Sequence, residues 1–216
     1  MRGSPEWHRH EHTVRRVREE DVARLVEVLV RAFDDDPIAH YFFRGTRRHE
    51  RGLRRFFDIQ MRREYLAAGE AWTTTALAGA ALWSPPDRPR PGMRDLLRLV
   101  PLLGDLMGVG RDAGNVARLL ADIERARPAE LHWYLGVLGT DPARQRTGVA
   151  GALLGEVLPR IDAEGLPAYL ETSKEENIAF YARHRFTVTG EIAAPDGGPT
   201  LWLMWRPPQA PPERPT

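Results

Sequence analysis

The chain has no cysteine, a single lysine and no long apolar run, and each absence excludes a class of protein. Without cysteine, it forms no disulfide, no thiolate metal site and no cysteine nucleophile. No run reaches about 18 apolar residues, so no segment of the sequence is expected to span a membrane. The net charge is +1, with 31 basic and 30 acidic residues, which argues against a dedicated nucleic-acid-binding protein.

The composition otherwise resembles that of an ordinary globular protein. The 216 residues are 42% apolar and 28% charged, which fits one large domain or one domain with an insertion. We expect a flexible tail over residues 1–12, a single domain over 13–206 and a proline-rich tail over 207–216. Because the first twelve residues lack the apolar core of a signal peptide, we expect a cytoplasmic protein. A monomer and a homodimer both fit the sequence.

Helical periodicity dominates the first part of the chain, interrupted by one hairpin. The acidic run at residues 19–21 suits a helix start, and this first helix is expected to stop near Asp36 and Pro37. The remaining predicted elements are a helix over 47–67, hairpin strands over 71–75 and 79–83, and a helical insertion over 93–127.

The second part alternates in the order strand, helix, strand, helix, strand, strand. The ranges are 132–140, 147–164, 168–172, 175–184, 186–192 and 200–205. A strand-helix-strand unit implies a parallel pair with a right-handed crossover, whereas the last two strands read as an antiparallel hairpin. The sequence therefore predicts an α/β (α+β) fold, with a mixed and mostly antiparallel sheet around a central parallel pair, flanked by helices.

Small residues open the helix that follows the strand over 132–140. Gly148, Ala150 and Gly151 allow a ligand to approach the backbone closely, and free amides at a helix start favour phosphate oxygens. Arg144 and Arg146 add positive charge. The loop matches neither the P-loop nor the dinucleotide-binding pattern, so packing and phosphate binding remain about equally good interpretations of these residues alone.

Asn177 and Tyr181 lie four residues apart, on one face of the next predicted helix. Such a pair can place an amide beside a ligand chain and a phenol beside its reactive end, where tyrosine can act as a general acid. Taken alone, a solvent-facing asparagine and a core tyrosine are the better interpretation.

Together, these motifs resemble those of the GNAT family, the GCN5-related N-acetyltransferases. Residues 145–150 (QRTGVA) resemble the family's Gln/Arg-x-x-Gly-x-Gly/Ala signature, and 177–181 (NIAFY) resemble its Asn-to-Tyr helix. Within the family, the chain is most similar to the puromycin-acetylating branch, through residues 167–173, 177–181 and 186–189. Trp133 and the segments at 71–72 and 83–86 fit as well.

The resemblance implies acetyl-CoA as the acetyl donor and direct attack by an amine, with no covalent enzyme intermediate and no metal. Main-chain groups of Leu138, Gly139 and Thr140 would pair with pantetheine as an added strand would. Asn177 would touch the pantetheine arm, and Tyr181 would protonate the departing thiolate. The pyrophosphate would be held by the amides of Gln145, Arg146, Thr147, Gly148, Val149, Ala150 and Gly151.

Two positions depart from the family pattern. Arg185 stands before Phe186, where the family usually has glycine; a positive φ there would cost arginine about 1–2 kcal/mol. Arg146 and Thr147 stand where glycine and a basic residue are frequent. Backbone amides supply most phosphate contacts, so we expect phosphate binding to survive.

The acetyl acceptor is harder to predict. Glu171 is a candidate general base near the carboxyl end of its strand, with a structural carboxylate as the equal alternative. The acidic run 34–36 is expected to be a solvated turn rather than an amine site, and a water chain is a further route for the proton. The arginine-rich stretch over 44–63 is expected to be a solvated helix face rather than a nucleic-acid stripe.

The resemblance implies a primary amine of a small molecule, for example an antibiotic such as puromycin, and hence an antibiotic-resistance role. A protein N-acetyltransferase and a non-catalytic acyl-CoA-binding module are the alternatives.

Overall fold

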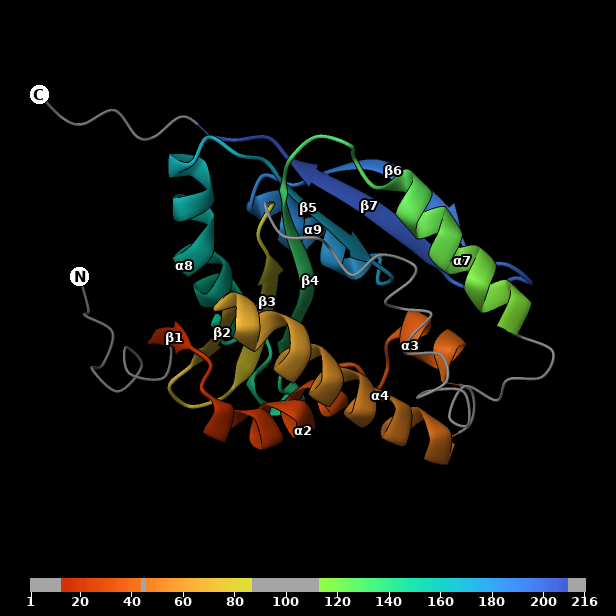
Figure 1. The fold of residues 1–216 in the computed structure, drawn as a ribbon, viewed down its shortest axis with the longest axis horizontal. Coiled ribbons are helices and arrows are strands. Elements are labelled where there is room, and N and C mark those ends of the chain that lie inside the picture. The colour runs from red at the N-terminus through yellow and green to blue at the C-terminus, as the bar shows by residue number, and fades with distance from the viewer. Residues whose placement is uncertain (1–12, 44–45, 87–112, 210–216) are drawn as a thin grey trace, which may run out of the picture.

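The computed structural model describes residues 13–43, 46–86 and 113–209, and their strands form one seven-stranded sheet in the order β1-β2-β3-β4-β5-β7-β6 (Figure 1). Only β4 and β5 pair in parallel; the other neighbours are antiparallel. This confirms the predicted mixed sheet. The strands are β1 (Val14–Arg16), β2 (Ala71–Thr74), β3 (Gly79–Ser84), β4 (Trp133–Thr140), β5 (Ala168–Thr172), β6 (Thr187–Ala193) and β7 (Thr200–Arg206).

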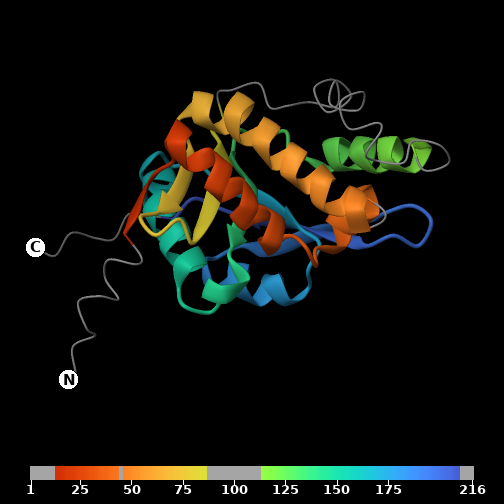
Figure 2. The same cartoon turned by 90° about the horizontal axis from the view of Figure 1, so that it is seen from below.

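Helices cover both faces of this sheet. Figure 2 shows α2 (Val22–Ala32), α4 (Thr46–Gln60) and α7 (Ala113–Ala126) on one side, and α8 (Val149–Ala163) and α9 (Glu176–Arg183) on the other. One core lies between the sheet and α2/α4, and a second lies between the sheet and α8. The sheet thus separates two packed layers, and a ligand entering between its strands would meet both.

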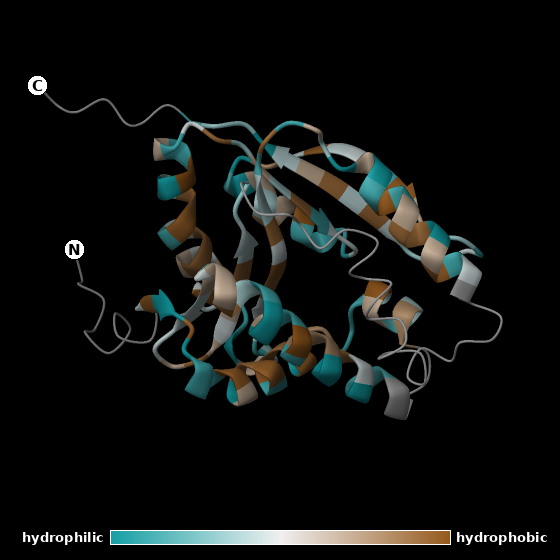
Figure 3. Cartoon of the chain, viewed as in Figure 1, coloured by the Kyte–Doolittle hydropathy of each residue, from teal (hydrophilic) through white to brown (hydrophobic). Residues whose placement is uncertain are grey.

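The outer helices are amphipathic, as the sequence predicts. Leu25 and Leu29 of α2 are fully buried, and Figure 3 shows hydrophobic and hydrophilic patches alternating along α2 and α4. Of the arginines in the predicted solvated face, Arg51 and Arg55 are exposed, together with Arg62 and Arg63. This part of the stripe therefore faces solvent, which is the expected arrangement for an amphipathic surface helix.

The helix predicted over 47–67 is continuous but changes its winding. After α4, residues Met61–Tyr65 form the π-helical segment η2, and α5 (Leu66–Ala68) ends at Gly69 with φ 69°. A π-helical turn inserts an extra residue per turn and is often found at functional sites. Here it ends with the buried Tyr65 facing the sheet.

Two elements were not predicted from the sequence. The first is β1 at the sheet edge, which pairs with β2. The second is α3 (Pro37–Phe42), which begins where the sequence analysis expected a helix to end. Pro37 occupies the first turn, where its missing N–H costs no hydrogen bond, and Asp36 caps the helix. The short 3-10 turn η1 (Glu19–Asp21) leads into α2, as the acidic run predicts.

Of the stretch expected to be a helical insertion, residues 113–126 are helical and form α7; residues 93–112 lie outside the described ranges, as do 1–12 and 210–216. Leu119 of α7, Tyr41 of α3 and Leu201 of β7 share a third hydrophobic cluster. The α7 helix therefore joins α3 to the last hairpin. Among the described residues, none of the helices has the length and apolar character needed to span a membrane.

Candidate active site

The candidate site begins where β4 and β5 part. These strands pair only at Trp133 with Ala168 and at Tyr134 with Tyr169, although β4 runs on to Thr140. On the other edge of β4, the register slips by one residue, from Trp83 opposite Leu135 to Leu82 opposite Val137. The extra residue of this bulge is Gly136. Bulges bend a strand and locally disrupt its ladder, so the divergence of β4 from β5 starts beside this glycine.

The bulge also changes which way the side chains of β4 point. Before it, Trp133 and Leu135 belong to the core under α8; after it, Val137 belongs to the core under α2 and α4. Gly136 itself must lack a side chain, because a Cβ there would lie 2.1 Å from the Tyr65 hydroxyl. An isolated glycine within a strand pattern is a sequence signal for such a bulge.

The predicted main-chain donors and acceptors lie on the open part of β4. Leu138, Gly139 and Thr140 pair with Ala81, Ala80 and Gly79 of β3 on one edge. On the edge toward β5, they have no strand partner within the part of the chain that the structure describes. The buried Thr140 hydroxyl also has no hydrogen-bond partner among the described residues. This edge is therefore able to pair with an extended ligand in the way that a further strand would.

The loop after β4 delivers a helix start to the same place. Asp141 accepts a hydrogen bond from the Ala143 amide and pairs with Arg31 of α2 at 2.5 Å, which fixes the 3-10 turn η3 (Pro142–Arg144). Burial raises the pKa of Asp141, but the Arg31 contact and the Ala143 amide outweigh it and hold that pKa below its usual value. The loop is thus anchored to α2 at its first residue.

The start of α8 leaves its amides free. Gly148 caps the helix with φ 98° and no side-chain hydrogen bond, and the first helical bond runs from the Ala152 amide to the Gly148 carbonyl. The amides of Val149, Ala150 and Gly151 therefore lack an acceptor within the helix. Arg146 also has a positive φ of 60°, where the family often has glycine. The predicted residues lie together in the loop before α8 and in its first turn: Gln145, Arg146, Thr147 and Gly148 are exposed, Val149 is buried, and Ala150 and Gly151 are half-buried.

Asn177 and Tyr181 lie on α9, as predicted. The Asn177 side-chain amide donates to the Thr172 hydroxyl at 3.4 Å, at the end of β5. Tyr181 is 7% exposed and belongs to the core under α8, and its ring meets that of Phe186 edge-on. Burial raises the pKa of the Tyr181 phenol, and the charge of Asp36 raises it further, so the phenol stays protonated at neutral pH.

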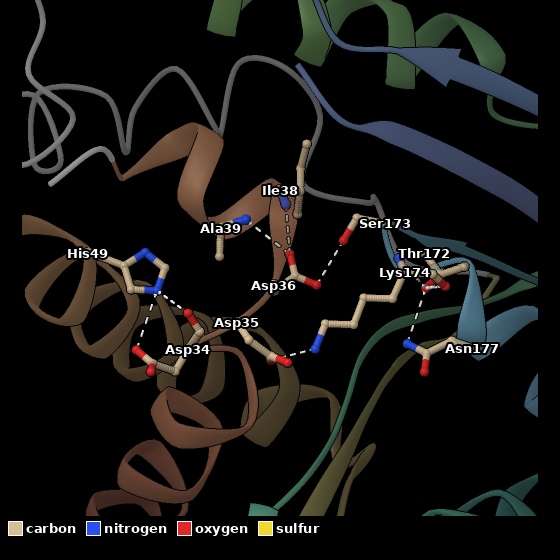
Figure 4. Close-up of polar contacts among 10 residues, drawn as sticks. All are labelled: Asp34, Asp35, Asp36, Ile38, Ala39, His49, Thr172, Ser173, Lys174 and Asn177. Atoms are coloured by element: carbon tan, nitrogen blue, oxygen red, sulfur yellow. Dashed lines mark hydrogen bonds and ion pairs between the residues drawn. The ribbon is translucent and has the colours of Figure 1, made fainter. Parts of the chain in front are cut away.

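The acidic run is not uniformly a solvated turn. Asp34 and Asp35 are exposed, as expected, but Asp36 is buried, which corrects the prediction for this residue. Figure 4 shows the Asp36 carboxylate between α3 and the end of β5. It accepts from the Ile38 and Ala39 amides at 3.0 Å each and from the Ser173 hydroxyl at 2.8 Å. The loop before α3 is thereby tied to the strand that borders the gap.

A second contact reinforces this tie. Lys174 donates to Asp35 at 2.5 Å, beside the Asp36 contact with Ser173 (Figure 4). The single lysine of the chain therefore pairs with one carboxylate of the acidic run.

Glu171 lies on the opposite face of β5 from Leu170, on the side of α4 and α7. Arg127 is its nearest cation, with Nε 3.9 Å from Oε1. Burial raises the pKa of Glu171; the charge of Arg127 and the hydroxyls of Tyr134 and Tyr169 lower it in part, and the pKa remains above its usual value. Oε1 has no hydrogen-bond partner of normal geometry among the described residues.

The surroundings of Glu171 were missed by sequence reasoning. Tyr134 and Tyr169 stack with ring centroids 6.1 Å apart, and the Arg127 guanidinium lies 4.6 Å from the Tyr134 ring centroid. Tyr65 reaches the same place from η2, and burial raises its pKa. These residues are distant in sequence, and no local pattern marks them. No group of three or more His, Cys, Asp or Glu residues suited to a metal ion occurs within the described ranges.

Comparisons with known proteins agree with this geometry. No protein-family model matches the chain. An uncharacterized N-acetyltransferase of Schizosaccharomyces pombe is 28% identical over 188 residues, which cover 82% of this chain and 75% of that protein.

Solved structures extend the similarity to nearly the whole chain. A Corynebacterium glutamicum structure described as histone acetyltransferase HPA2 and related acetyltransferase is 29% identical, covers 93% of this chain and 98% of its own, and has a TM-score of 0.69. The PaiA N-acetyltransferase of Thermoplasma acidophilum, solved with coenzyme A, shares the fold at 12% identity, with a TM-score of 0.55 and coverage of 90% and 97%.

The parted parallel strands, the open helix start behind them and the similarity over most of the chain lead to one conclusion: this protein has the GNAT fold and is an acetyltransferase of the GNAT type.

Proposed function

We propose that the protein transfers an acetyl group from acetyl-CoA to a primary amine of a small molecule. The observation that carries this proposal is the placement of two ionisable groups on opposite faces of β5, beside the gap. Tyr181 belongs to the layer under α8, whereas Glu171 faces the layer of α4 and α7. A proton donor on one side and a proton acceptor on the other suit a reaction that runs through the gap.

The donor side would be held mostly by main-chain groups. The open edge of Leu138, Gly139 and Thr140 would pair with the pantetheine arm. The free amides at the start of α8, with Arg146 nearby, suit the pyrophosphate, because a helix N-terminus favours negative charge. Asn177, part-buried at the end of β5, would donate to the pantetheine arm from the far side of the gap.

Two side chains would manage the protons. Acetyl-CoA supplies a thioester carbonyl, which the neutral amine attacks so that a C–N bond forms and the C–S bond breaks. Glu171 takes the proton that the amine loses, and its raised pKa suits a base working near neutral pH. Tyr181 gives its phenolic proton to the departing sulfur. This proton is available because burial and the charge of Asp36 keep the phenol protonated.

The described surface favours a small acceptor over an extended peptide. The Tyr41 hydroxyl of α3 donates to the Pro195 carbonyl in the β6–β7 turn at 3.2 Å, and α7 packs against both elements. Side chains therefore bridge α3 and the last hairpin on the acceptor face. Among small amines, puromycin is the acceptor that the sequence resemblance suggests, and it would give an antibiotic-resistance role.

The test is an acceptor screen with acetyl-CoA, read by thiol release and by mass spectrometry of the product. The panel contains puromycin, other primary amines and lysine-bearing peptides. We expect acetylation of at least one small amine and a loss of kcat of about 10²–10⁴-fold in Tyr181→Phe, which removes only the hydroxyl.

The alternatives predict other results. Acetylation confined to peptides would indicate a protein acetyltransferase. Tight coenzyme A binding with no product from any amine would indicate a binding module. A Tyr181→Phe rate within about threefold of wild type would assign the proton to another group.

A further inference from the structure

Arg127 is a largely buried cation whose Nε, the atom nearest Glu171, lacks a hydrogen bond of normal geometry within the described ranges. It follows α7, and its amide continues the helix by donating to the Ile123 carbonyl at 3.2 Å. Its side chain is 13% exposed, and Nε and Nη1 have no hydrogen-bond partner of normal geometry among the described residues. Removing a guanidinium from water costs free energy unless an opposite charge or hydrogen bonds compensate for the lost hydration. We therefore looked for a group whose interaction with Arg127 explains its position.

The groups that face Glu171 come from four elements. Tyr134 of β4 and Tyr169 of β5 approach the carboxyl, Tyr65 of η2 lies behind them, and Arg127 closes the cluster from the end of α7. Three further titratable groups contact or influence these residues. Glu124 pairs with Arg127 at 3.4 Å, and the His132 ring meets the Tyr169 ring edge-on. The charge of Glu64 raises the pKa of Tyr65 further. Burial raises the pKa of Glu171, and the charge of Arg127 is the strongest influence in the opposite direction.

The separation of 3.9 Å between the two charged groups matters for a base. A bidentate arginine contact would occupy the lone pairs of the carboxylate and stabilise it strongly. At 3.9 Å, the charge still favours the ionised form, but Oε1 remains without a donor. The stacking of the guanidinium on the Tyr134 ring holds it at this separation.

We propose that Arg127 is a positioning residue that sets the protonation of Glu171, keeping the carboxylate ionised while leaving Oε1 open to accept the proton of the acceptor amine. The inference rests on the proposed function in one respect, namely that Glu171 is the base. Arg127 touches neither the donor nor the reacting atoms in this account and acts through Glu171 alone.

The first test is the pH dependence of kcat/KM for Arg127→Met, which keeps a long apolar stem against the Tyr134 ring. We expect the acidic limb to move to higher pH by at least about one unit, since an opposite charge at this distance shifts a carboxyl by that order. The rate at the alkaline plateau should stay within a few-fold of wild type. Arg127→Lys keeps the charge and should leave the limb near its wild-type position.

Arg125→Met is the matched control, because Arg125 lies on the same helix with an exposed side chain and pairs with Asp122. Its limb should not move. If Arg127→Met does not fold, Arg127→Gln replaces it, with the same expected shift. An equal shift in Arg125→Met would overturn the inference, as would a folded neutral variant in which neither the limb nor the titration midpoint of Glu171 moves.

The second test is independent of activity and separates this inference from the proposed function. The side-chain carboxyl of Glu171 is titrated by ¹³C NMR in the free protein, with its resonance assigned through Glu171→Gln. We expect its titration midpoint to rise by about one unit in Arg127→Met. A midpoint that rises while the kinetic limb stays fixed keeps the coupling and removes Glu171 as the base. An unchanged midpoint overturns the coupling itself.

Discussion

The two sides of the gap are built differently. The proposed donor side is formed mainly by one stretch of chain, residues 138–151, which presents main-chain groups at a strand edge and a helix start. The proposed acceptor side is assembled from side chains of η2, β4, β5 and the end of α7, with Glu171 and Arg127 at its centre. Main-chain groups are placed by the fold itself, whereas the carboxylate depends on neighbours that arrive from distant parts of the sequence.

This difference has consequences for how each side fails. A donor site made of backbone amides is insensitive to most side-chain changes but is blocked by bulk or negative charge at one point. An acceptor site made of buried ionisable side chains is sensitive to single substitutions and to pH. The variants below are chosen to affect one side and leave the other intact.

The largest effect is expected on the donor side, in Gly148→Glu. The substitution adds bulk and negative charge beside the free amides of α8, at a φ of 98° that favours glycine. Coenzyme A affinity by calorimetry should fall at least about 100-fold, because like charges repel in a phosphate site.

Two control variants separate the causes in Gly148→Glu. Gly148→Ala introduces the backbone strain without the charge, and Gly155→Glu adds the charge on exposed helix surface with open space around it. Both should bind more tightly than Gly148→Glu. Unchanged affinity in folded Gly148→Glu would remove the donor assignment.

Glu171→Gln should impair the proposed acceptor side and leave coenzyme A binding intact. With Glu171 as the proposed base, we expect activity to rise with pH as this carboxyl, whose pKa burial raises, loses its proton; the amide of the variant cannot titrate. We expect turnover to fall by about 10²-fold and the acidic limb of the pH–rate profile to flatten, with coenzyme A affinity unchanged.

Glu175→Gln is the control, since Glu175 is an exposed carboxylate four residues further on. Normal turnover with an unshifted limb in Glu171→Gln would return this residue to a structural role.

Gly136→Ala tests the bulge that separates the two sides. Its Cβ would lie 2.1 Å from the Tyr65 hydroxyl and 3.2 Å from the ring carbon that carries it. We expect a loss of stability of about 1–3 kcal/mol by chemical denaturation, because Tyr65 must move.

The double variant with Tyr65→Phe removes the closest contact and should recover part of that loss. A Gly136→Ala protein as stable as wild type, with no coupling to Tyr65→Phe, would contradict the close approach.

The smallest effect is expected just after α9, in Arg185→Gly. Arg185 has φ 67°, which confirms the positive φ that its place in the sequence suggested. Glycine should relieve this strain and raise the free energy of unfolding by up to about 1 kcal/mol, measured by denaturant titration. Arg185→Ala loses the same side-chain hydrogen bond to Gln209 but keeps the strain, so it should not be stabilised. Equal stability of the two variants would argue against strain.

The difference between a site formed by one stretch of chain and a site assembled from distant residues also explains how much could be predicted from the sequence. Small residues after a strand, and Asn177 four residues before Tyr181, are local patterns, and the structure places them as expected. The burial of Asp36 could not be predicted, because its partner Ser173 lies 137 residues away in the sequence. Glu171 was found by its place on a strand, but Arg127 has no neighbour in sequence that marks it.

For the fold, too, local patterns were predictable and long-range arrangements were not. Periodicity predicted the main helices and the parallel pair, whereas β1 and α3 are too short for a period to show. The position of β7 between β5 and β6 follows from packing between distant strands, which no local pattern encodes.

Amide hydrogen exchange with and without coenzyme A tests the central claim most directly, because it reports the main-chain groups of the donor side one segment at a time. We predict slower exchange over residues 136–140 and 148–151 in the complex, with residues 187–193 of β6 unchanged as an internal reference. Saturated binding with no change over 136–140 would contradict the claim that the donor lies along β4, in the gap that opens toward β5.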